Sequence, residues 1–296
     1  MLKKAPTVVR RLLLASLFLL ITLAAHAQTR VNPPRNLLGV GADIELGRET
    51  ARVVESESRL LHDAEVSAYI DRLGRDLVAA LPEQYRRREF VYTFRLLDDA
   101  EPNAKALAGG IIYVNRGLIE LARDEGELAG VLSHEISHVA LRHVTAQVGK
   151  AMLAQMGVAV LGGVLGDGQK GQAAQFGAQA GLQLYLLKYS RDYETQADVL
   201  GAQIMARAGY HPSGMVSFFR RLEGEGGGRR APRWLSSHPD LQSRAVRVTQ
   251  EAAMLVTAPR WSFGASGLSR VQARLRGTRD ARSRRQSTFV WPAWNN

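Results

Sequence analysis

The sequence predicts an α+β fold that is mainly helical and contains a small β-sheet. Apolar residues recur at spacings of two to four positions from Ile44 to about Leu81, a pattern typical of helices. Two short segments rich in β-branched and aromatic residues, 90–97 and 111–114, predict strands. Helical patterns then dominate to about residue 256. With 296 residues, 46% of them hydrophobic, the chain can bury a core as one large domain or two small ones.

The composition excludes several classes of site. The chain has no cysteine, which excludes disulfides, thiolate zinc sites and a lipid-modified amino-terminal cysteine. A metal ion would therefore be held by imidazole and carboxylate groups. Lys and Arg outnumber Asp and Glu by 39 to 28, and this net charge of +11 allows an anionic partner without identifying one.

Residues 1–27 have the pattern of a secretory signal peptide. Four basic residues precede a largely apolar run over 12–25, which is short for a membrane span but suits the hydrophobic region of a signal. Residues 25–27, Ala-His-Ala, fit the cleavage pattern, so we expect an exported, soluble mature chain that begins at Gln28. The alternative is an uncleaved membrane anchor. Cleavage removes four of the 39 basic residues and leaves 35 against 28 acidic ones, a net charge of +7.

The connecting segments have distinct compositions. Residues 31–35 predict an exposed leader, and Pro82 ends the first helical stretch because proline cannot continue a helix. Segment 98–110, between the two predicted strands, is rich in turn residues. Segment 157–181 is rich in Gly, Ala and Gln, and predicts either a mobile helical lid or a pair of helices packed through small residues.

A basic tail, residues 257–296, follows a main domain over 28–256. From residue 260 onward it contains eight Arg, one acidic residue and five aromatic residues. Arginine with interleaved aromatics can bind nucleic acid or an anionic surface. For an exported protein we expect no nucleic acid, and we favour a solvated, partly disordered tail over peripheral contact with a membrane.

The motif H-E-x-x-H at His134, Glu135 and His138 indicates the chemistry. On a helix, residues four apart lie on one face, so both imidazoles can bind one metal ion. Glu135 is rotated by about 100° around the axis, which brings it to the edge of the site, where a base acting on the metal's water must lie. Asp124 and Glu127 have the spacing of a capping box, which supports the helix. About 0.01 chance matches are expected, so two surface histidines on a solvated helix are the weaker interpretation.

A tetrahedral catalytic zinc needs a third protein ligand and one open position. The extended motif H-E-x-x-H-x-x-G-x-x-H fails here, because Leu141 and Val144 stand at its Gly and final His positions. His143 lies five residues past His138 and points to a different helix face. We therefore expect His143 to be a structural or supporting residue and not a ligand.

A second predicted helix, from Arg191 to Ala208, offers the missing ligand. It carries Glu194 and Asp198 four residues apart on one face. Glu194 can bind the metal while Asp198 accepts the remaining N–H of a ligand histidine and so sets its tautomer. The alternative is a solvated acidic face, which the flanking apolar residues weaken.

These two helices resemble metallopeptidase family forty-eight, the gluzincin group that includes the CAAX prenyl protease and HtpX-like quality-control proteases. The resemblance rests on residues 134–143 (HEISHVALRH) and 194–198 (ETQAD). Three further segments match the family: 103–110, 208–212 and 236–239. The resemblance covers about residues 40–250 and implies a gluzincin-type zinc metallopeptidase, with its active-site helix against a small β-sheet.

The resemblance also implies roles for individual residues. The implied ligands of one Zn²⁺ per chain are His134, His138 and Glu194. Asp198 then supports a ligand, and Glu135 is the catalytic base. His238 would approach the open side of the metal, either as an oxyanion stabiliser or as a displaceable fourth ligand.

The sequence departs from the family in three respects. Lys105 and Ala108 stand where a bulky apolar residue and a proline are usual, which leaves the substrate preference open. The membrane-spanning helices of the prenyl-protease and HtpX branches are absent. The resemblance is therefore to the soluble periplasmic branch, without the helical-repeat domain that some of its members append.

The resulting prediction is a periplasmic zinc endopeptidase that hydrolyses unfolded or misassembled envelope proteins, with envelope assembly machinery as a partner. We expect strand 111–114 to pair with the backbone of an extended substrate. Mn or Co could occupy the same ligands. The alternative is a non-proteolytic chaperone-like protein or an anionic-surface adaptor; Glu135 and Glu194 argue against the chaperone, since a binder needs no base beside a metal.

Overall fold

The computed structural model describes residues 28–165, 189–225, 234, 237–258 and 266–287. The expectations for the signal peptide and for most of segment 157–181 lie outside these residues. Within the described part of the chain, no helix combines the length and the hydropathy needed to cross a bilayer.

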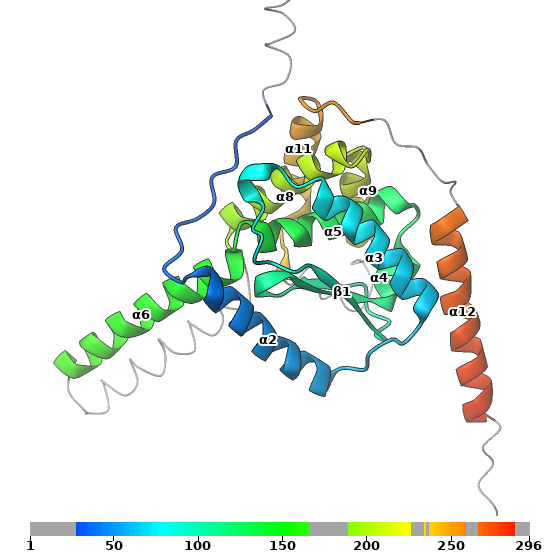
Figure 1. The fold of residues 1–296 in the computed structure, drawn as a ribbon, viewed down its shortest axis with the longest axis horizontal. Helices are drawn as coiled ribbons and strands as arrows, with labels where there is room; N and C mark the ends of the chain where they lie inside the picture. The colour runs from blue at the N-terminus through cyan, green and yellow to red at the C-terminus, as the bar shows by residue number, and fades with distance from the viewer. Residues whose placement is uncertain (1–27, 166–188, 226–233, 235–236, 259–265, 288–296) are drawn as a thin grey trace, which may run out of the picture.

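The amino-terminal helical pattern corresponds to two helices, α2 (Val40–Glu57) and α3 (Ala64–Ala79). They separate at Asp63, whose side chain accepts the N–H groups of Glu65 and Val66 at 3.1 and 3.2 Å and so caps α3. The 3₁₀ turn η1 (Glu83–Tyr85) follows α3. Helices α2 and α3 lie at different sides of the sheet (Figure 1).

Three strands form the sheet, in the order β1-β3-β2. They are β1 (Thr93–Leu97), β2 (Ala104–Ala106) and β3 (Ile111–Asn115). The central strand β3 runs parallel to β1 and antiparallel to β2, and the 3₁₀ turn η2 (Ala108–Gly110) joins β2 to β3.

The structure confirms that both predicted segments contain a strand. It corrects the boundaries of the first strand and the expected role of the second. β1 begins at Thr93 and not at Phe90, and the turn-rich segment contains an additional strand, β2, whose Ala-Lys-Ala sequence carries no β-branched residue. The expectation that strand 111–114 pairs with substrate is wrong, because β1 and β2 occupy both of its edges. Among the described strands, β2 is an edge strand next to α5.

The carboxyl-terminal half is helical, and α5 runs through its centre (Figure 1). Its helices are α4 (Arg116–Leu121), α5 (Glu125–Ala140), α6 (His143–Leu165), α8 (Arg191–Arg207), α9 (Ser213–Glu225) and α11 (Leu241–Ala252). Helix α5 contacts α3, α8, α9 and β2, and its apolar residues Leu128, Leu132 and Ile136 are fully buried in the core. Polar groups on such a helix lose water and need partners inside the protein.

Asp124 and Glu127 both cap α5, but Glu127 bonds to the N–H of Arg123 and not to that of the N-cap residue Asp124, as a capping box would require. Asp124 Oδ1 accepts the N–H of Glu127, and Glu127 Oε2 accepts the N–H of Arg123, both at 2.9 Å. Glu127 is fully buried and also accepts hydrogen bonds from Ser217 and Arg221, which ties α5 to α9. The helix ends before Arg142, whose φ of +58° lies in the left-handed region and breaks the helical path.

The leader is more firmly attached than its composition predicts. Val31 is buried, and its carbonyl accepts the Tyr85 hydroxyl at 2.6 Å. The N–H of Thr29 donates to Glu251 Oε1 at 3.2 Å, and its carbonyl accepts Gln203 Nε2 at 2.7 Å. Residues 29–31 therefore bind the body through backbone groups that carry no side-chain signature.

The interpretation of residues 257–296 as a solvated tail is also wrong for part of the segment. Helix α12 (Ser266–Ser287) lies against α3 and α4 (Figure 1). Leu268, Val271 and Leu275 form its buried stripe. Gln272 Nε2 donates to the carbonyls of Ile119 and Ala122, which terminate α4. A short apolar stripe thus docks the helix despite its many arginines.

Candidate metal centre

Helix α5 presents the two motif histidines side by side inside the protein. His134 and His138 are both fully buried, and their Nε2 atoms lie 3.0 Å apart. This is the same-face placement that the four-residue spacing predicts.

Helix α8 brings Glu194 to the same point, as the sequence predicts. Its Oε1 lies 3.4 Å from His138 Nε2, and its Oε2 lies 3.6 Å from His134 Nε2. The side chain of Glu194 is 3% exposed, so its charge is almost fully removed from water. A buried carboxylate in this position requires a cationic partner.

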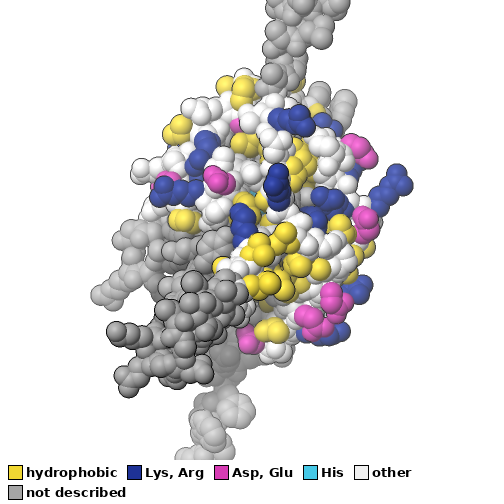
Figure 2. Space-filling model, turned by 90° about the vertical axis from the view of Figure 1, so that its left-hand side faces the viewer, with side chains coloured by type: hydrophobic (Ala, Val, Ile, Leu, Met, Phe, Trp, Pro, Cys, Tyr) yellow, Lys and Arg dark blue, Asp and Glu magenta, His cyan; other side chains and the backbone are white. Residues whose placement is uncertain are grey.

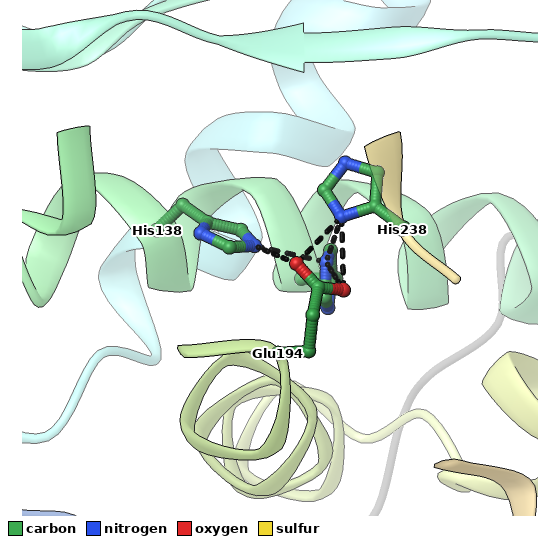
Figure 3. A group of neighbouring side chains, drawn as sticks. His138, Glu194 and His238 are labelled. Carbon is green, nitrogen blue, oxygen red and sulfur yellow. Dashed lines mark hydrogen bonds and ion pairs between the residues drawn. The ribbon is translucent and has the colours of Figure 1, made fainter. Parts of the chain in front are cut away.

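His238 completes the group from the segment before α11 (Figure 3). Its Nδ1 lies 2.9 Å from both Glu194 oxygens and 3.2 Å from His134 Nε2. One donor atom from each of His134, His138, Glu194 and His238 lies within 4.8 Å of the others, and all four residues are buried. The structure thus brings together every residue that the sequence predicts around the metal.

The spacing of these four donors fits a tetrahedral metal ion. Ligands 2.0–2.2 Å from a central zinc are separated from one another by about 3.3 Å. The distances from His134 to His138 and His238, and from Glu194 to His138 and His238, run from 2.9 to 3.4 Å, and all four donors lie within 4.8 Å of one another. Three imidazoles and one carboxylate are also the ligand types that zinc accepts in the absence of cysteine.

The hydrogen bonds behind the cluster give a second test of this fit. His134 Nδ1 lies 3.0 Å from Asp198 Oδ1 and donates its hydrogen there. His143 Nε2 donates to Gln196 Oε1 at 3.0 Å, so its Nδ1 accepts the N–H of His138 Nδ1, also at 3.0 Å. Both Nε2 atoms of the motif therefore carry lone pairs, which repel one another at 3.0 Å unless a cation lies between them. The residues present fit a metal ion.

His143 lies behind His138 and is not among the four converging donors. It belongs to α6, because α5 ends at Ala140 and the left-handed conformation of Arg142 changes the chain direction before His143. Its ring stacks on Tyr193 of α8 with a centroid distance of 4.5 Å.

Glu135 occupies a different place from the four metal-facing residues. Its Oε2 accepts the N–H of Ala106 at 2.9 Å, which fixes the carboxylate beside the edge strand β2. Its Oε1 lies 3.4 Å from Trp234 Nε1 and 3.6 Å from His238 Nε2. Glu135 thus lies at the edge of the cluster, where the rotation of about 100° from His134 predicts it.

The charges of three site residues suit metal binding, whereas His238 differs: burial alone would lower its pKa, but Glu194 raises it. Burial lowers the pKa of His138 to about 4, although Glu194 acts in the opposite direction. Burial alone would raise the pKa of Glu194, but His238 and Arg244 hold it well below its usual range. The pKa of Asp198 is likewise lowered, because Arg244 and His134 outweigh its burial. Neutral imidazoles and ionised carboxylates are the forms that bind metal.

Arg244 is the site residue that the sequence interpretation missed. Its guanidinium is 1% exposed and contacts both Asp198 and Glu194, at 2.7 and 2.9 Å. A signal was available, since Arg244 stands between Leu241 and Val248 at spacings of three and four, on the buried face of α11. A charge on the apolar face of an amphipathic helix indicates a buried partner.

The crossing of α5 and α8 depends on Gly201. A Cβ atom on Gly201 would lie 3.2 Å from the backbone nitrogen of His134 and 2.9 Å from Met215 Cε.

We expect Gly201→Val to push the helices apart, lowering the free energy of unfolding by about 1–3 kcal/mol and weakening metal binding. Urea unfolding of the metal-free protein measures the first effect. Gly41→Val is the matched control, because nothing lies within 4 Å of a Cβ on Gly41; equal losses in both variants would contradict the expected role of the crossing.

Comparison with known proteins agrees with this site. A family model described as "Peptidase family M48" matches residues 64–252. The chain is 32% identical over 265 residues to a beta-barrel assembly-enhancing protease of Yersinia pestis, covering 83% of this chain and 54% of that protein. It is 30% identical over 223 residues to the protein of that name in Escherichia coli (strain K12), covering 73% and 45%. It is 29% identical over 160 residues to the mitochondrial metalloendopeptidase OMA1 of Schizosaccharomyces pombe, covering 54% and 46%. The chain spans about half the length of these relatives.

Proposed function

The chain belongs to peptidase family M48, and on this basis we propose that it is a zinc-dependent endopeptidase of the cell envelope. The observation that carries the proposal is the buried convergence of His134, His138 and Glu194 on one point, with Glu135 beside it. In this proposal those three residues hold the zinc, and Asp198 and His143 fix the tautomers of its two histidine ligands.

The chain's own groups then perform the proton transfers. A bound zinc would supply Lewis acidity for attack on a peptide carbonyl. Glu135, held by the Ala106 N–H, accepts a proton from the attacking water and returns it to the leaving nitrogen. The site is buried, so few other water molecules compete for the Glu135 carboxylate. This strengthens its interactions with the attacking water and with the leaving nitrogen.

The outer edge of β2, which pairs with no other described strand, is the proposed binding surface for the substrate backbone. Ala106 on this strand already directs its N–H to Glu135, so a peptide paired with β2 would pass directly over the base. Pairing of this kind requires an extended chain and favours unfolded segments. Hydrophobic side chains gathered on the face drawn in Figure 2 would suit the apolar residues that such segments expose.

The envelope setting rests on two supports. The predicted signal peptide directs the chain to the periplasm, and two relatives carry names that refer to β-barrel assembly. We therefore propose unfolded or misassembled envelope proteins as substrates and envelope assembly machinery as a partner.

Zinc content and casein cleavage test this proposal together. We expect about one zinc per purified chain and cleavage that a chelator abolishes and added zinc restores. Zinc-free protein that nevertheless protects unfolded clients from aggregation would favour the chaperone-like alternative. Co-isolation of envelope proteins with an inactive Glu135→Gln variant would identify the substrates.

His238 sets the resting activity in this proposal. With its Nδ1 at 3.2 Å from His134 Nε2 and 2.9 Å from Glu194, it lies at the fourth ligand position, where water must bind for hydrolysis. We expect His238→Ala to raise basal proteolysis, measured with a quenched peptide at equal zinc content. A fall in kcat of about 10²–10³-fold would instead assign His238 to oxyanion stabilisation. Unchanged kinetics would remove it from both roles.

A further inference from the structure

Arg244 connects three parts of the site through one side chain. It lies on the first turn of α11 and forms a two-point ion pair with Asp198, from Nε to Oδ2 at 2.8 Å and from Nη2 to Oδ1 at 2.7 Å. Its remaining nitrogen, Nη1, lies 2.9 Å from Glu194 Oε2 and 3.2 Å from the carbonyl oxygen of His238. All three nitrogens of the guanidinium are therefore in use.

Aromatic rings hold this guanidinium in place. Its carbon lies 4.6 Å from the ring centroid of Phe219 and 4.9 Å from that of Trp234. Trp234 in turn stacks on His238 with a centroid distance of 4.7 Å. Contact with these two rings, whose centroids are 5.6 Å apart, restricts movement of the guanidinium and so steadies the direction of each N–H.

Each contact of Arg244 constrains a different metal-facing group. The pair with Asp198 orients the carboxylate that receives the N–H of His134. The contact with Glu194 engages Oε2 and leaves Oε1 facing His138. The bond to the His238 carbonyl anchors the backbone from which that imidazole reaches the cluster. A planar fork with five donors can satisfy these acceptors together, whereas an ammonium group cannot.

We propose that Arg244 is the positioning residue of the metal site: it sets which Glu194 oxygen faces the metal and holds His238 at the fourth position. This inference rests on the proposed function, because it assumes that the cluster binds zinc. It extends that function by assigning the resting geometry to a residue that is not one of the four metal-facing donors, although its Nη2 lies 3.5 Å from His134 Nε2.

The test compares Arg244→Lys with a matched control, Arg247→Lys, one turn further along the same helix. The Nη2 of Arg247 donates to Ser243 Oγ at 3.0 Å, and among the described residues Arg247 makes no hydrogen bond or ion pair with the cluster. We expect Arg244→Lys to bind zinc about 10–100-fold more weakly in a chelator competition, as loss of a supporting contact usually does. The visible spectrum of the cobalt-loaded variant should shift in the same direction as that of His238→Ala. Arg247→Lys should match the wild type in both measurements.

The outcomes separate this inference from the proposed function. A wild type that binds no zinc overturns the proposed function. A wild type that binds zinc, together with an Arg244→Lys variant of unchanged affinity and cobalt spectrum, overturns only the positioning role. Circular dichroism checks the fold, and Arg244→Gln, which keeps a planar donor, replaces the lysine variant if that one does not fold. If neither variant folds with zinc present, Arg244 is a folding determinant and the proposal is overturned.

Discussion

Replacement of Glu135 by Gln is expected to leave zinc bound and to lower kcat by about 10²–10⁴-fold, the usual contribution of a general base. The amide keeps the size of the side chain, and its oxygen can still accept the N–H of Ala106, so the edge strand and the four metal-facing residues remain in place. It cannot take a proton from water at neutral pH. The loss should therefore appear in kcat, with the substrate still bound.

Zinc analysis of the purified variant and cleavage of a quenched peptide measure these two effects separately. Glu223→Gln is a suitable comparison, because Glu223 is exposed on α9 and undergoes the same chemical change away from the site. We expect that variant to retain most of its turnover. Activity of Glu135→Gln close to the wild type would remove Glu135 from the mechanism, whereas loss of zinc from it would show a role in the metal site.

Replacement of Glu194 by Ala is expected to reduce zinc affinity far more than replacement of Asp198. Glu194 supplies the carboxylate that faces both motif histidines, at 3.4 and 3.6 Å. Asp198 faces only the far nitrogen of His134, so Asp198→Ala should weaken binding by about 10–100-fold. Removal of either acid also breaks one of the two buried ion pairs of Arg244 and leaves the other, so both variants lose stability.

Competition with a chelator of known affinity measures the zinc affinity of each variant, and so shows which substitution weakens zinc binding more. Thermal unfolding of the metal-free proteins serves as the control for the charge effect, which both variants share. After that correction, the difference in zinc affinity reports ligation alone. If Glu194→Ala retains wild-type zinc stoichiometry under competition, the third ligand lies elsewhere.

Local patterns in the sequence were sufficient for the elements that carry the site. The four-residue spacing of His134 and His138, and that of Glu194 and Asp198, follows from helix geometry alone. The capping of α5 by Asp124 and Glu127 is equally local, since its two hydrogen bonds join residues three and four positions apart. These features survive any arrangement of the surrounding helices, which is why they could be predicted.

The errors arose where tertiary contacts override local preference. β2 has weak strand propensity and exists because β3 pairs with it, and that pairing removes the edge that strand 111–114 was expected to offer. Helix α12 docks through three apolar residues within an arginine-rich segment whose composition indicates solvation. In both cases a few contacts with distant residues outweigh the signal of the segment itself.

The sequence by itself therefore determined the chemistry that we propose for this protein: the expected ligand types, their helices and the expected base beside them. Only the tertiary structure decided how α5, α8 and the segment before α11 converge, since that depends on close packing at Gly201 and on the charge of Arg244. It also brought His238 to the same cluster and made Ala106 the partner of Glu135. The physical reason is the distance along the sequence over which each interaction acts. Helix geometry relates residues four positions apart, whereas the buried charge of Arg244 pairs with Asp198 and Glu194, 46 and 50 positions away, which no local pattern can predict.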